Sequence, residues 1–184
     1  QLGPRFGPDR LPLLARFLGD LPRDFAWAVE LRHHDWFDSG ENEKRVNDLL
    51  RHLQIDKVLF DSRPLFQDPP DDEIEKVAQD RKPRTPVRQT VTGNHPMLRL
   101  VGRNRVELTD RFLNQWVPII AGWIQQGLNP YVFTHAPDDR FAVALARRLA
   151  GRLKIEMPKT DCSIPWPPAP VQQLSLLHES SDEK

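Results

Sequence analysis

The chain has 184 residues, of which 26 are Lys or Arg and 26 are Asp or Glu, so its formal net charge at pH 7 is zero. A chain of this length can form one domain with a hydrophobic core, while its balanced charge gives no bulk attraction to nucleic acid or to anionic membranes. The single cysteine, Cys162, cannot form an internal disulfide, and no apolar run approaches the roughly 20 residues that span a bilayer. We therefore expect a cytoplasmic protein.

The first half of the chain alternates between helical and strand patterns. LPLLARFLGDL, near the start, has the apolar spacing of a helix, and the strand-length run AWAVELR (26–32) follows it. In ENEKRVNDLLRHLQ (41–54) apolar residues recur at i, i+3, i+4 and i+7. Acidic residues occupy the first turn of this predicted helix, where the helix dipole favours negative charge. KVLFDSR (57–63) predicts a second strand.

The second half repeats this alternation after an interruption. Residues 79–96 are basic and rich in turn residues, and they predict an extended loop. The apolar runs MLRLVGR (97–103) and PYVFTHA (130–136) predict two further strands. A helix is expected between them, beginning at Thr109 and kinked or split by Pro118. Another helix is expected after the last strand.

Strands that alternate with helices at this spacing predict βαβ units and a parallel sheet, either an open doubly wound sheet or a (β/α)₈ barrel. Central strands of open sheets are apolar on both faces. Along the first strand, one set of alternate positions holds small and then polar residues, and the other set holds large apolar residues. This asymmetry favours the barrel, because small or polar residues can point into its interior while large apolar residues point outward against the helices.

Four strands cannot close such a barrel, and the opening QLGPRFGP has the pattern of a strand end entering a turn. We therefore predict that residues 1–157 form the C-terminal half of a TIM-barrel-like α/β domain and that the missing N-terminal half belongs to the full-length protein. Residues 158–184 are rich in proline and predict an extended tail that is partly disordered.

Polar side chains gather at the predicted C-terminal ends of the strands, which is where both architectures place function. A rim of carboxylates, guanidinium groups and an imidazole can bind an anion and move a proton. The candidate catalytic residues are the carboxylates Glu30 and Asp61. The candidate ligand-binding residues are Arg32, Trp36, Arg63, Arg99, Gly102 and His135.

Each of these groups also has a structural interpretation. Glu30 and Arg99 can neutralise each other as a buried ion pair, and Asp61 can anchor a loop. His135 can be a hydrogen-bonded histidine at a strand end, and Trp36 can be a lid over the barrel. No HExxH, paired cysteines, acidic cluster at ligand spacing, GxGxxG, P-loop or GxSxG is present. The sequence therefore predicts no metal site and leaves any cofactor undetermined.

Six segments in order resemble the YecE-like family, the group defined by domain of unknown function 72. They are VELRHHDWF, VLFDSRP, KPRTPV, PMLRLVG, YVFTHAPD and QLSLL. The resemblance covers residues 1–177 and is strongest with the bacterial branch that gives the family its name. It implies a TIM-barrel-like fold and an N-terminal portion with the first barrel strands, but no settled reaction. Many relatives have histidine where this chain has Val101, and they often have asparagine at His135.

The segment QLSLL (173–177) resembles the short peptide by which bacterial DNA-repair proteins bind the sliding clamp. In that interpretation Gln173 fixes the register, the leucines anchor in a groove, and the Pro-rich leader presents the peptide. The anchoring residues are Leu174, Leu176 and Leu177. The alternative is that this peptide docks on its own barrel.

Two hypotheses therefore follow from the sequence. In the first, the protein binds or turns over a small anionic, phosphate-bearing ligand at the rim. In the second, it is a non-catalytic or DNA-repair-associated protein that the sliding clamp recruits through the tail.

Overall fold

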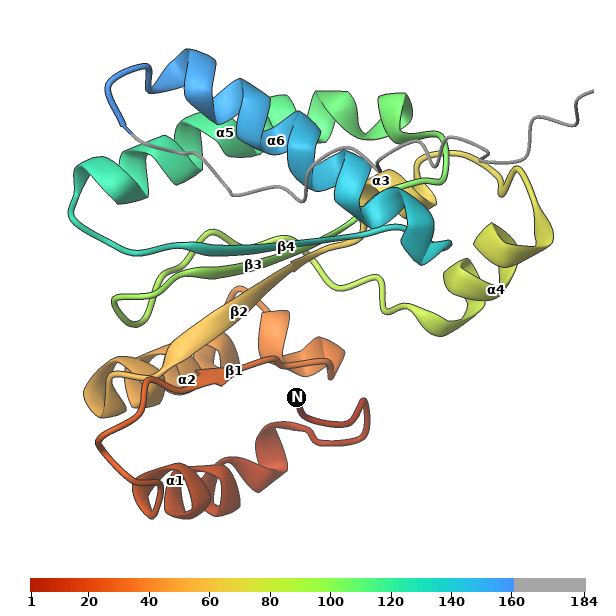
Figure 1. The fold of residues 1–184 in the computed structure, drawn as a ribbon. Helices are drawn as coiled ribbons and strands as arrows, with labels where there is room; N and C mark the ends of the chain where they lie inside the picture. Colours follow the sequence, from red (N-terminus) through yellow and green to blue (C-terminus); the bar gives the residue numbers. More distant parts are fainter. Residues whose placement is uncertain (161–184) are drawn as a thin grey trace, which may run out of the picture.

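A computed structural model describes residues 1–160, which form an α/β fold around one parallel sheet (Figure 1). The strands lie in the order β1-β2-β3-β4, so each strand is hydrogen-bonded to its neighbour in the sequence. Parallel neighbours require a crossover connection, and helices occupy these crossovers. The strands are β1 (Ala28–Val29), β2 (Asp56–Asp61), β3 (Met97–Val101) and β4 (Tyr131–His135).

Six α-helices and four short 3₁₀ turns connect and cover the strands in the described part of the chain. The helices are α1 (Leu11–Gly19), α2 (Glu41–Leu53), α3 (Arg63–Phe66), α4 (Glu73–Arg81), α5 (Asp110–Gln125) and α6 (Ala142–Glu156). The 3₁₀ turns are η1 (Pro8–Arg10), η2 (His34–Phe37), η3 (Val106–Thr109) and η4 (Asp139–Phe141). Pro118 lies inside α5 without splitting it.

The first strand and the loop over 79–96 have observed boundaries that differ from the predicted ones. The first strand pairs over β1 alone and not over residues 26–32, because a ladder also depends on the neighbouring strand. The predicted loop 79–96 begins three residues later than expected, since α4 continues to Arg81. The Asp72 side chain caps this helix by accepting a hydrogen bond from the Glu75 backbone N–H.

The two faces of the sheet have different surroundings. On one face, Leu59, Leu98 and Leu100 pack against α5 and α6, which lie side by side over β3 and β4 (Figure 1). On the other face, which we call the open face, Tyr131 and Phe133 remain 52% and 47% exposed. Side chains alternate between the faces, so the register that pairs Phe133 with Arg99 and His135 with Val101 places all four residues on the open face.

A second core lies between α1 and α2 and includes Leu14, Leu31, Trp36 and Leu50. Within residues 1–160, no helix combines the length and the apolar character that crossing a membrane requires. The predicted tail from residue 161 onward, with Cys162 and the predicted partner-binding residues, lies outside the described residues. Those residues are Gln173, Leu174, Leu176 and Leu177.

Candidate functional site

The carboxylate of Glu30, one residue after β1, binds two arginines. Arg32 Nε donates a hydrogen bond to Glu30 Oε1 at 2.9 Å, and Arg99 Nη1 donates to Oε2. Glu30 is 3% exposed. The guanidinium of Arg99 also lies over the ring of Phe60, with 5.7 Å between Cζ and the ring centroid. Because both oxygens of Glu30 are engaged, this carboxylate fixes the positions of the two arginines, and the cluster keeps one net positive charge.

His135, at the end of β4, lies on the same face of the sheet as Arg99, two positions beyond Phe133, which pairs with Arg99. Burial lowers the pKa of His135 below its ordinary value, and the positive charges of Arg99 and Lys82 lower it further against the opposing effect of Asp139 and Glu30. The neutral form is therefore favoured near pH 7. A neutral imidazole beside two cations can accept a proton or a hydrogen bond.

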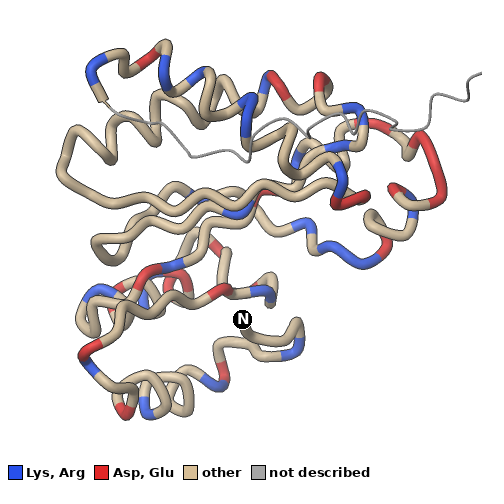
Figure 2. The backbone as a smooth tube through the Cα atoms, in the orientation of Figure 1, with Lys and Arg blue, Asp and Glu red and all other residues tan. Residues whose placement is uncertain are grey.

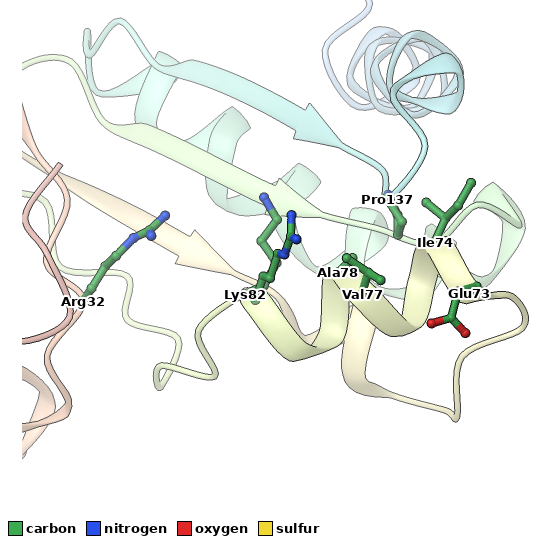
Figure 3. A pocket seen from close by; sticks show the side chains of 8 residues that line it. Arg32, Glu73, Ile74, Val77, Ala78, Lys82 and Pro137 are labelled. Atoms are coloured by element: carbon green, nitrogen blue, oxygen red, sulfur yellow. The ribbon is translucent and has the colours of Figure 1, made fainter.

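A cavity of about 550 Å³ opens beside the cluster at the carboxyl edge of the sheet (Figure 3). Arg32 reaches it from the segment after β1, Pro137 from the segment after β4, and α4 with Lys82 forms the remaining wall. Its lining residues are Arg32, Glu73, Ile74, Val77, Ala78, Arg81, Lys82 and Pro137. The chain directly after α4 is rich in basic residues, which are blue in Figure 2.

A buried ion pair holds α4 at this edge. Glu75 and Arg103 are 0% and 1% exposed, and Arg103 Nη2 lies 2.6 Å from Glu75 Oε2. Arg103 also donates to the backbone carbonyls of Asp68 and Pro69. Burial acts to raise the pKa of Glu75, but hydrogen bonds from Arg103 and from two backbone N–H groups outweigh it, and the pKa lies below its ordinary value. The carboxylate is therefore ionised, and the pair fixes α4 to the loop after β3.

Asp61 and Arg63 lie away from the Glu30 cluster. Asp61 accepts hydrogen bonds from Trp116 Nε1 at 2.8 Å and from Arg63 Nε and Nη2 at 3.0 and 2.7 Å. The Arg63 guanidinium lies 5.3 Å from the centroid of the Phe112 ring. Both aromatic partners belong to α5, so this pair joins the end of β2 to the helix that covers the opposite face of the sheet.

Gly102 and Trp36 contribute to packing. A Cβ atom at Gly102 would lie 2.7 Å from Thr109 Oγ1 and 2.8 Å from Leu145 Cδ1, so the glycine allows close contact with the covering helices. Trp36 is fully buried in the core beside α2, and its Nε1 donates to the Phe6 carbonyl at 2.8 Å. Its ring therefore offers no stacking surface to a ligand.

The structure thus brings together four of the predicted site residues, namely Glu30, Arg32, Arg99 and His135. Sequence reasoning missed Arg81 and Lys82, although the basic character of their segment was visible. It also missed the role of Arg103, because nothing in the sequence pairs this residue with Glu75. Within the described residues, no group of three His, Cys, Asp or Glu side chains is arranged to hold a metal ion.

The chain is similar to proteins of known sequence over most of its length. It is 36% identical over 177 residues to the UPF0759 protein YecE of Escherichia coli K12, an alignment that covers 96% of this chain and 63% of that protein. The YecE protein of E. coli O157:H7 gives the same identity and coverage. The chain therefore spans less than two thirds of the length of these curated relatives.

Two crystal structures share the fold. A DUF72 family protein from Enterococcus faecalis V583 superposes with a TM-score of 0.59 at 16% identity, covering 87% of this chain and 60% of that one. A DUF72 family protein from Thermotoga maritima MSB8 gives a TM-score of 0.54 at 20% identity, covering 85% and 55%. A family model described as "Protein of unknown function DUF72" matches residues 1–172. The chain therefore belongs to the DUF72 family.

Proposed function

We propose that the protein binds a small anionic, phosphate-bearing ligand in the cavity between Arg32 and α4. The observation that carries this proposal is the charge of the lining. Among the described residues that line the cavity, Arg32, Arg81 and Lys82 are cationic, and Glu73 is the only carboxylate. An excess of positive charge in a concave site favours anions. Guanidinium and ammonium groups are also the side chains that bind phosphate oxygens most strongly.

The Glu30 cluster supports this site by preorganising it. Glu30 engages Arg32 Nε and so fixes the guanidinium plane at the edge of the cavity before a ligand arrives. A fixed binding group loses less conformational entropy on association than a mobile one. Glu30 is therefore proposed as a positioning residue. His135 does not line the cavity, but the charge of the cavity residue Lys82 acts on it, and it replaces Glu30 as the candidate for proton transfer if the ligand is turned over.

We also propose that the sheet is part of a TIM-barrel-like fold. The sequential parallel order supports this, as do the covering helices on one face and the half-exposed Tyr131 and Phe133 on the other. In a closed barrel the open face would be interior, where side chains pack in layers. Function in such barrels lies at the C-terminal ends of the strands, which is the edge that carries the cavity.

Isothermal titration with inorganic phosphate tests the proposed function. Lys82→Met should weaken binding about tenfold or more, because a charge-assisted contact is lost. Lys154→Met removes the same charge from an exposed position of α6 outside the cavity and should leave the affinity unchanged. Equal phosphate affinity in the wild type and Lys82→Met, or no binding by the wild type, would refute the proposal.

The second candidate function, recruitment by the sliding clamp, rests on the sequence of the tail. The family match ends at residue 172, directly before QLSLL. A peptide of residues 170–184 should bind purified clamp, and the same peptide with Gln173→Ala and Leu176→Ala should not. No binding by the unaltered peptide at high micromolar concentration removes this candidate.

A further inference from the structure

The orientation of α4 is inverted relative to that of an ordinary surface helix. Such a helix turns its apolar side chains to the core and its charged side chains to solvent. In α4, Glu75 is the buried residue, while Ile74 and Val77 are 48% and 37% exposed. The ion pair of Glu75 with Arg103 anchors the helix, so Ile74 and Val77 are not needed to hold it in place.

The exposed apolar side chains form one continuous wall of the cavity. Ile74, Val77, Ala78 and Arg81 stand at i, i+3, i+4 and i+7, and therefore lie along one side of the helix. Figure 3 shows Val77 and Ala78 beside Pro137, and Lys82 at the end of the helix nearer to Arg32. One end of the cavity is thus lined mainly by apolar side chains, with the Glu73 carboxylate at its edge, and the other end is cationic.

We propose that the ligand is an organic phosphate monoester whose ester group is apolar. Its phosphate group contacts Lys82, Arg81 and Arg32, and its apolar group covers Ile74 and Val77. Covering these side chains removes apolar surface from water, which stabilises the complex beyond the charge contacts. This inference rests on the proposed function and specifies the class of ligand for the same cavity.

The test compares three phosphates by isothermal titration of the full chain at about pH 8, where phosphate groups carry close to two negative charges. The probes are inorganic phosphate, glycerol 3-phosphate and phenyl phosphate. Phenyl phosphate should bind about tenfold more tightly than glycerol 3-phosphate, which has the same charged group and a polar body. Val77→Ser should reduce this advantage to about threefold or less, without changing the affinity for inorganic phosphate.

Val143→Ser is the matched control, because Val143 is also an exposed helical valine, in α6 and outside the cavity. It should leave all three affinities unchanged. Equal affinity for phenyl phosphate and glycerol 3-phosphate overturns this inference but not the proposed function. If none of the three phosphates binds, both fail. A third outcome also overturns the inference: the wild type self-associates, and Val77→Ser abolishes this association without changing the affinity for phenyl phosphate. The apolar wall would then be a contact between copies of the chain.

Discussion

Asp61 is fully buried, and its two oxygens accept hydrogen bonds from Trp116 and Arg63. Glu30 is a second buried carboxylate near a strand end, yet it lies with Arg99 on the open side of the sheet. The difference arises from the alternation of side chains along a strand, since neighbouring positions point to opposite faces. Two carboxylates in similar sequence contexts therefore have different partners, and only Glu30 contacts an arginine that lines the cavity.

Asp61→Asn should destabilise the protein by about 2–4 kcal/mol, because the amide nitrogen cannot accept from Trp116 or Arg63 and the guanidinium loses its counter-charge. The affinity for inorganic phosphate should not change. Urea denaturation measures the free energy of unfolding, and isothermal titration measures the affinity. If the variant has normal stability but has lost phosphate binding, Asp61 is a residue of the binding site and the structural interpretation is wrong.

At the scale of elements, the close contact between the end of β3 and the covering helices depends on Gly102. The residue makes a backbone hydrogen bond to the His135 carbonyl at 2.8 Å, while Thr109 and Leu145 occupy the space where a Cβ atom would lie. The glycine thus ties the end of β3 to the end of β4 and leaves room for helix packing. This contact helps to hold Arg99 on β3 and His135 on β4 in register.

Gly102→Ala should lower stability by about 1–3 kcal/mol through overpacking. Gly151→Ala, in α6, adds the same methyl group where nothing lies within 4 Å. This control should be neutral or more stable by about 0.5–1 kcal/mol, because alanine is the better helix former. Thermal unfolding should show a lower midpoint for Gly102→Ala and an unchanged or higher midpoint for Gly151→Ala. A Gly102→Ala variant as stable as Gly151→Ala would contradict the packing described here.

The elements with the clearest hydrophobic periodicity were predictable from the sequence, and α4 was not. The strand predicted over 57–63 and the helix predicted over 41–54 agree with β2 and α2 to within two residues at each end, because their apolar residues face the core. In α4 the buried residue is Glu75, so the helical spacing of Ile74, Val77 and Ala78 does not mark the side of the helix that packs against the core. Its partner Arg103 is 28 positions away, and only the folded chain shows their contact.

At the scale of the whole molecule, His135 links stability to pH. Its pKa in the folded protein is lowered by burial and by Arg99 and Lys82, whereas an unfolded chain has the ordinary value of about 6.5. As pH falls through about 6.5, the unfolded state therefore binds a proton before the folded state does. The contribution of neutral His135 to stability is present above this pH and is lost progressively below it.

We expect the free energy of unfolding to fall between about pH 7 and pH 5.5 less steeply in His135→Asn than in the wild type. The difference in slope between the two proteins should be at most about 1.4 kcal/mol per pH unit, the limit for one proton. Urea denaturation at several pH values measures it, and the comparison removes the contribution of groups common to both proteins. Parallel curves would show that His135 titrates alike in the folded and unfolded states.

Because of the inverted orientation of α4, the residues proposed to recognise the ligand are not the residues that hold the helix in the fold, so the two sets can evolve separately. Since Glu75 and Arg103 anchor the helix, substitutions at Ile74 and Val77 leave the packed core intact. Where a residue shapes a ligand pocket and also supports the fold, new specificity arises at the expense of stability. In the proposed site the apolar wall can diversify among homologous chains while the scaffold stays constant, and the preference for the proposed ligand can diverge without a change of fold.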